Sequence, residues 1–103
     1  MSDFANPLHE ECGVFGIYDK AGTEDVAVAV YSALYALQHR GQESCGMAVN
    51  EDGVITGHRD LGLVNEVFTS QVMEAMRKPE ARMATGHVRY ATAGSRVRAN
   101  AQP

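Results

Sequence analysis

Small and apolar residues alternate over residues 13–19, and this pattern predicts a buried strand near the start of the chain. Residues 20–22 then form a turn. Thr23 is expected to cap the helix that follows, with Glu24 and Asp25 in its first turn complementing the helix dipole. The helix is predicted from apolar residues that recur at spacings of three and four, namely Val26, Val30, Leu34 and Leu37.

Basic residues and a glycine mark the expected end of this helix. His39 and Arg40 suit its last turn, and Gly41 suits the position just beyond it. Two strands, at residues 45–50 and 54–58, are then predicted to form a hairpin. The Asp-Gly pair between them tolerates the positive φ angles of a tight turn.

The second half of the chain is predicted to add a short helix and one more strand. Residues 61–68 are apolar but favour neither a helix nor a strand. Residues 69–77 are predicted to form a helix stopped by Pro79, and residues 82–90 to form a strand. Residues 91–103 have the small and polar composition of a loop. This order of elements favours a mixed α/β or α+β layered fold.

Composition limits the chain to one ordinary globular domain and excludes several classes of function. The 103 residues are 45% hydrophobic and 21% charged, with a net charge of −4. No basic stripe indicates a nucleic-acid binder, and no apolar run reaches membrane-spanning length. Residues 1–11 lack the features of a secretion signal. Two cysteines make no disulfide framework, so a reducing cytoplasm is expected.

Cys12 is the first candidate for chemistry, because it precedes Gly13 at the start of the predicted strand and follows an acidic leader. A cut just before Cys12 would give this residue both a thiol and a free α-amine. An α-amine titrates near pH 7.7–8.0, so it can take the thiol proton and activate the sulfur as a nucleophile. The alternative interpretation is that Cys12 is a small buried hydrophobic residue.

Two arginines are the next candidates. Arg40 and Gln42, after the predicted helix, either line a pocket beside the first strand or belong to a polar loop. Arg89, at the end of the last strand, either is solvated or holds a carboxylate through two parallel hydrogen bonds, with the loop after it able to cover a ligand. Cys45 is expected to be structural.

Metal and phosphate sites are not predicted. No glycine-rich phosphate loop is found, and the histidines are scattered without the spacing of metal ligands. These histidines are His9, His39, His58 and His87.

Three segments taken in order carry a resemblance to a known family. They are residues 11–17 (ECGVFGI), 37–43 (LQHRGQE) and 86–95 (GHVRYATAGS). Together they resemble the class II glutaminase domain of amidophosphoribosyltransferases, from about Glu10 to Pro103. Residues 1–11 resemble the propeptide of one branch of this family. Residues 12–103 resemble the N-terminal part of the glutaminase domain.

The resemblance implies a fold, a reaction and roles for particular residues. The fold would be the N-terminal portion of an N-terminal nucleophile (Ntn) hydrolase, an α+β four-layer αββα sandwich. Cys12 would be the nucleophile that hydrolyses glutamine, and Arg89 would hold the glutamine α-carboxylate. Arg40 would border the site, and residues 90–95, with Tyr90 and Thr92, would close over the substrate.

The resemblance also implies parts that lie beyond Pro103. These are an Asn-Gly oxyanion hole, an aspartate for the substrate amine, and a phosphoribosyltransferase domain that uses the ammonia on phosphoribosyl pyrophosphate. Magnesium would serve that domain, and some relatives carry an iron–sulfur cluster on later cysteines. No cofactor is expected for residues 1–103, which alone would be inactive. The full-length protein is expected to be a cytoplasmic homo-oligomer in purine synthesis.

Other interpretations remain at this stage. The segments also suit another class II amidotransferase, such as glutamate synthase or glucosamine-6-phosphate synthase. They also suit a fragment that keeps the motifs without activity. A third possibility, chance occurrence, would require all three motifs to coincide in the correct order.

Overall fold

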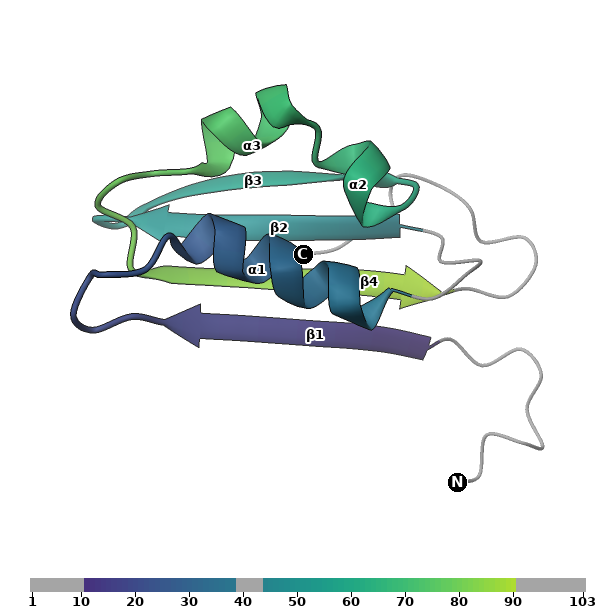
Figure 1. The fold of residues 1–103 in the computed structure, drawn as a ribbon, viewed down its shortest axis with the longest axis horizontal. Helices are drawn as coiled ribbons and strands as arrows, with labels where there is room; N and C mark the ends of the chain where they lie inside the picture. The colour runs from purple at the N-terminus through teal and green to yellow at the C-terminus, as the bar shows by residue number, and fades with distance from the viewer. Residues whose placement is uncertain (1–10, 39–43, 91–103) are drawn as a thin grey trace.

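The computed structural model describes residues 11–38 and 44–90 of the chain. In this part, four strands form one antiparallel sheet in the order β1-β4-β2-β3, and the helices cover one of its faces (Figure 1). The strands are β1 (Glu11–Tyr18), β2 (Ser44–Glu51), β3 (Val54–Leu61) and β4 (Met83–Tyr90). The helices are α1 (Val26–Leu37), α2 (Val64–Val67) and α3 (Ser70–Met76). The architecture is α+β.

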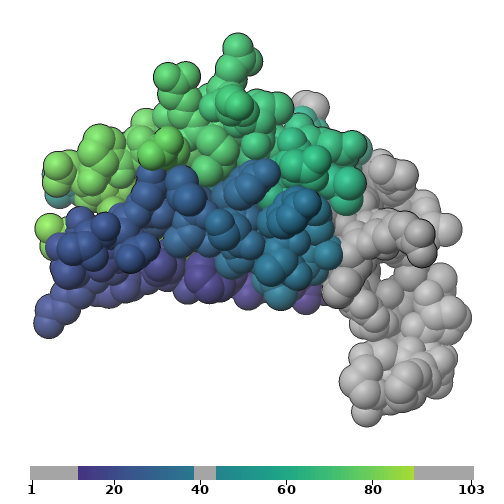
Figure 2. All heavy atoms as spheres, viewed as in Figure 1, coloured from purple at the N-terminus to yellow at the C-terminus, as the bar shows by residue number. Residues whose placement is uncertain are grey.

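The core lies between the sheet and helix α1, which packs across strands β1, β4 and β2. The apolar stripe predicted from the sequence is the buried face of this helix, with Leu37 only partly buried. Figure 2 shows α1 and the two shorter helices as one layer over the sheet. Buried residues of this core include Val26, Val30, Leu34, Met47, Val49, Val64, Phe68, Met76 and Val88.

Glycine allows the close approach of α1 to strand β4. A Cβ atom added to Gly86 would lie 2.5 Å from Val30 Cγ1 and 2.8 Å from Leu34 Cδ1. Real Cβ atoms do not come so close to other heavy atoms, so the helix could not stay where it is. The absence of a side chain at position 86 therefore sets the distance between the helix and the sheet.

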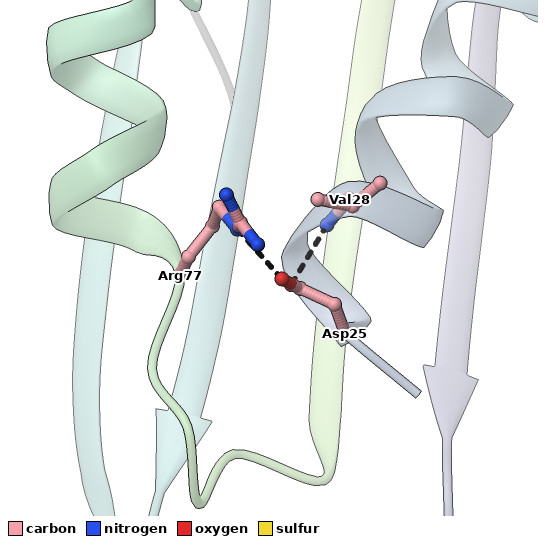
Figure 3. Close-up of polar contacts among 3 residues, drawn as sticks. All are labelled: Asp25, Val28 and Arg77. Atoms are coloured by element: carbon pink, nitrogen blue, oxygen red, sulfur yellow. Dashed lines mark hydrogen bonds and ion pairs between the residues drawn. The ribbon is translucent and has the colours of Figure 1, made fainter. Parts of the chain in front are cut away.

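The N-terminus of α1 differs from the sequence prediction. Its cap is Asp25 and not Thr23, so Glu24 and Asp25 are not in the first turn. The Asp25 carboxylate accepts a hydrogen bond from the Val28 N–H at 3.2 Å and pairs with Arg77 Nε at 2.6 Å (Figure 3). Asp25 therefore satisfies an orphan helix donor and also ties α1 to the residue that follows α3.

The C-terminus of α1 was also predicted wrongly. The helix ends at Leu37, before His39 and Arg40, and Gln38 has an extended backbone with ψ of 145°. The Gln38 side chain accepts a hydrogen bond from the Val64 N–H at 2.9 Å, at the first turn of α2. Gln38, the residue at which the helix stops, therefore contacts a residue 26 positions further along the sequence.

The hairpin prediction is confirmed. Strands β2 and β3 pair from Ser44 with Leu61 to Glu51 with Val54, so only Asp52 and Gly53 lie between them. Both turn residues have positive φ, 54° and 87°, as a type I′ turn requires.

The short helix and the last strand predicted in the second half of the chain are both present. The short helix predicted at 69–77 is α3, with Thr69 as its cap, and the strand predicted at 82–90 is β4. The ambiguous segment 61–68 divides between the end of β3 and the short helix α2. None of the described helices has the length and apolar character needed to cross a membrane.

The face of the sheet opposite the helices carries exposed apolar side chains. Val14 and Tyr18 on β1, Ile55 on β3 and Met83 on β4 are 69%, 66%, 68% and 43% exposed. Successive residues of a strand point to opposite faces, and the strand register shows that these four residues alternate with those that face the core. They therefore share the face away from the helices.

Substituting Gly86 with alanine tests the contact between α1 and β4. We expect Gly86→Ala to lower the free energy of unfolding by about 1–3 kcal/mol, because overpacking forces the helix or its side chains to shift. Gly16→Ala is the matched control, since a Cβ atom there would come no closer than 3.7 Å to another residue. Chemical denaturation measures both, and equal stability of the two variants would contradict this account of the packing.

Candidate functional site

Three polar residues lie in one row across adjacent strands. Cys12 on β1 pairs directly with Arg89 on β4, and Arg89 pairs directly with Ser44 on β2. Directly opposite residues of antiparallel strands have Cβ atoms about 4.5–5.5 Å apart and point to the same side of the sheet. The row therefore brings together two residues, Cys12 and Arg89, that are 77 positions apart in the sequence.

The three side chains point away from the helices. Their neighbours Gly13 and Val88 face α1, since a Cβ atom on Gly13 would lie 3.0 Å from Val88 Cγ2 and 3.4 Å from Leu37. Successive residues of a strand point to opposite faces, so Cys12 and Arg89 lie on the other face. This is also the face with the exposed apolar residues, of which Tyr18, Ile55 and Met83 lie at the other end of the strands from the polar row.

The residues of the row differ in how far they are buried. Cys12 is exposed, whereas Arg89 is 8% exposed and Ser44 is fully buried. Arg89 is therefore not the solvated strand-end arginine of the plainer interpretation. A buried guanidinium next to an accessible thiol presents a planar fork of N–H donors, which suits the recognition of an anionic group.

His87 joins this group, although the sequence interpretation gave it no role. It precedes Arg89 by two residues on β4, so both side chains lie on the same face, and it is only 7% exposed. Burial, together with the positive charge of Arg89, lowers the pKa of His87 below its usual value of 6.5. The imidazole is therefore neutral at neutral pH.

Two polar atoms of this cluster have no hydrogen-bond partner among the residues that the structure describes. They are Ser44 Oγ and His87 Nδ1. A buried polar atom that gains no partner costs about 1–3 kcal/mol, so each of these atoms favours a partner from outside the described residues. Strand alternation could have indicated His87 from the sequence, because positions 87 and 89 share a face; Ser44 had no comparable signal.

The other predicted site residues have different outcomes. Tyr90 is the last residue of β4, and Arg40 and Thr92 lie outside the described residues. Cys45 is fully buried on the helix side of the sheet, with its Sγ 3.7 Å from the Gly62 carbonyl oxygen, which agrees with a structural role.

Other features of the described residues lie away from this cluster. Residues 11–38 and 44–90 contain no group of three or more histidine, cysteine, aspartate or glutamate side chains that could hold a metal ion. An open hollow lies at the opposite end of the sheet, around the Asp52-Gly53 turn. It is lined by Tyr18, Glu80, Arg82 and Met83 among others, and none of them belongs to the polar row.

Comparison with known proteins relates this fold and site to one group of enzymes. No protein-family model matches the chain. A solved structure of the allosteric regulatory enzyme of purine biosynthesis matches with a TM-score of 0.74 and 40% identity, over 87% of this chain and 18% of that one. The glutamine phosphoribosylpyrophosphate amidotransferase of Bacillus subtilis, solved with ADP and GMP, matches with a TM-score of 0.71 and 37% identity over the same shares.

Curated sequences agree with these structures. The amidophosphoribosyltransferase of Mycobacterium tuberculosis is 49% identical over 95% of this chain, and that of Mycobacterium leprae is 50% identical over 98%. The chain is thus homologous to one region of enzymes of the amidotransferase class. That region belongs to amidophosphoribosyltransferases, as the three motifs indicated, and the chain spans about 18% of the length of the curated relatives it matches.

The lowered pKa of His87 predicts how stability depends on pH. The unfolded chain takes up the His87 proton near pH 6.5, whereas the folded chain takes it up only at lower pH. Below pH 6.5 the unfolded state therefore binds more protons, and stability falls as the pH falls towards the folded-state pKa. We expect a lower denaturation midpoint at pH 5.5 than at pH 7.5.

His87→Asn is the control for this effect, since asparagine is polar but does not titrate. The difference in midpoint between the two pH values should shrink in this variant. The Asp19 carboxyl does not interfere, because hydrogen bonds, chiefly from the Glu24 N–H, lower its pKa below 3.8. An unchanged difference in His87→Asn would show that His87 is not the group that titrates.

Proposed function

We propose that this chain is the part of a glutaminase that carries the nucleophile, with Cys12 and Arg89 as its central residues. The observation that supports this most directly is their cross-strand pairing on one face of the sheet, with the thiol exposed and the guanidinium buried. The relation to amidophosphoribosyltransferases supplies the substrate class, since a related enzyme is described as a glutamine phosphoribosylpyrophosphate amidotransferase.

The proposed reaction begins when the peptide bond between Glu11 and Cys12 is cut. The α-amine freed on Cys12 takes the thiol proton, and the sulfur attacks the side-chain amide carbon of glutamine. The C–N bond breaks, and the amide nitrogen leaves as ammonia with the proton returned from the amine. Water then hydrolyses the thioester to glutamate and regenerates the thiol. In the uncut chain the Cys12 nitrogen is an amide with no basicity, so the precursor is inactive.

Arg89 binds the α-carboxylate of glutamine in this proposal. Its fork of N–H donors matches a carboxylate bidentately, and its position directly across from Cys12 holds the substrate over the sulfur. Arg40 borders the site, and Tyr90 and Thr92 belong to the segment that closes over the substrate.

The whole protein is proposed to pass its ammonia to phosphoribosyl pyrophosphate and to form phosphoribosylamine in purine synthesis. That reaction requires a phosphoribosyltransferase domain, with magnesium, outside the segment that this chain matches. An iron–sulfur cluster, where one exists, would also lie on other residues. A cytoplasmic homo-oligomer is the proposed form of the whole protein.

The fuller fold is proposed to be the four-layer αββα sandwich of Ntn hydrolases, with residues 1–11 as a removable leader and residues 12–103 as the N-terminal part of the glutaminase domain. The exposed apolar residues on the face opposite the helices support a second layer, because folded proteins rarely leave a large contiguous apolar patch in water. A second sheet packed on that face would cover Val14, Tyr18, Ile55 and Met83.

The nucleophile can be tested in the full natural protein that contains this chain. We expect Cys12→Ser to abolish glutamine hydrolysis while synthesis with free ammonia continues, because only the ammonia supply is lost. Cys45→Ala is the matched control, since Cys45 lies on the other face of the sheet, and it should keep glutamine use. An electrophilic glutamine analogue should label Cys12 alone. Glutaminase retained in Cys12→Ser would rule out the assignment.

The activating cut has its own test. Intact mass and N-terminal sequencing of the active natural protein should show a chain that begins at Cys12. A variant lacking residues 2–11, whose initiator Met precedes Cys12 and can be removed by the cell, should be fully active. Glutamine hydrolysis at full rate by a protein that still begins at Met1 or Ser2 would overturn the proposed role of the α-amine.

A further inference from the structure

Ser44 and His87 flank Arg89 on the same face of the sheet. Ser44 lies directly across from Arg89 on β2, and His87 lies two residues before it on β4. Ser44 Oγ and His87 Nδ1 are buried, and neither has a hydrogen-bond partner among residues 11–38 and 44–90. Buried polar atoms are normally satisfied, so two exceptions beside one arginine call for a functional explanation.

Both atoms are able to accept a hydrogen bond. A serine hydroxyl has two lone pairs, and a neutral imidazole has one acceptor nitrogen. The residues directly across from His87 are Val14 on β1 and Gly46 on β2, and neither carries a charge. The charged groups on this face near His87 are Arg89 and, one strand further away, Arg59, so the surroundings of His87 favour its neutral form.

The donors of Arg89 outnumber the acceptors that its substrate offers. A guanidinium has five N–H donors, and a carboxylate bound in the bidentate mode takes two of them. The other donors can take further acceptors, and each acceptor gained in a buried site stabilises the charged group. One acceptor on the neighbouring strand β2 and another on β4 itself can fix the plane of the Arg89 guanidinium.

We propose that Ser44 and His87 are positioning residues, whose Oγ and Nδ1 accept hydrogen bonds from the Arg89 guanidinium when it holds the α-carboxylate of the amino-acid substrate. The inference rests on the proposed glutaminase function and adds two residues to it. They act through Arg89 and do not touch the reacting amide. Their effect is therefore on substrate binding and not on the chemical step.

Steady-state kinetics of glutamine hydrolysis by the full natural protein tests this role. Ser44→Ala and His87→Leu should each raise the glutamine KM about tenfold with little change in kcat, the size expected for a hydrogen bond to a charged group. Ser44→Thr, which keeps the hydroxyl, should restore most of the affinity. Thr85→Ala is the matched control: Thr85 lies on the same strand and face but is exposed, and its variant should behave as wild type.

A pair of polar substitutions identifies the atom at work and does not depend on the apolar variant folding. Asparagine places a polar atom near the position of Nδ1, whereas glutamine places one near Nε2. His87→Asn should therefore keep a KM near that of wild type, and His87→Gln should raise it. Thermal unfolding of each variant confirms that the protein measured is folded.

A double-mutant cycle separates positioning from general structural support. In an Arg89→Lys background the guanidinium is gone, so the effects of Ser44→Ala and His87→Gln on KM should shrink to less than about twofold. Effects that persist in full in that background would overturn the inference, as would a wild-type KM in both Ser44→Ala and His87→Gln. A wild-type protein that hydrolyses no glutamine would instead refute the proposed function, and this inference would fall with it.

Discussion

The pairing register between strands β1 and β4 is the constraint on which the site depends. It sets Cys12 opposite Arg89, and a shift of one residue would turn one of these side chains towards the helices. The helix face fixes this register, since Gly13 and Gly86 must lie under α1, where a Cβ would crowd Leu37, Val30 or Leu34. Glycines on one face therefore determine which polar groups meet on the other.

The two faces of the sheet carry different kinds of residue. The face under α1 holds the apolar core, and a polar contact at each end holds that helix: Asp25 binds Arg77, and Gln38 binds Val64. On the opposite face, buried polar residues lie at one end of the strands, and Tyr18, Ile55 and Met83 lie exposed at the other end. A rigid scaffold on one side thus supports a polar site on the other, which is how a sheet can hold catalytic groups within narrow geometric limits.

The polar end of the sheet buries two basic side chains, Arg89 and His87. Burial, together with the charge of Arg89, lowers the pKa of His87 and keeps it neutral. Buried polar atoms without partners and neighbouring basic groups are costly in a free protein. Such costs are typical of binding sites, where a ligand of complementary charge recovers part of the lost free energy.

Sequence and structure differ in particular places, for physical reasons. The period of apolar residues determined α1, the Asp-Gly pair determined the β2–β3 turn, and the three motifs were sufficient to recognise the family. These signals are local, or are carried by residue type alone. The ends of α1 were predicted wrongly because Asp25 and Gln38 bind residues 52 and 26 positions away.

The sequence by itself therefore determined the four strands, the helices α1 and α3, the candidate thiol and the candidate guanidinium. Only the tertiary structure decided that Cys12 and Arg89 pair directly, that Arg89 is buried, and that Ser44 and His87 flank it. Strand order and register cause this difference. They arise from the packing of a whole sheet against one helix, and no window of neighbouring residues contains that information.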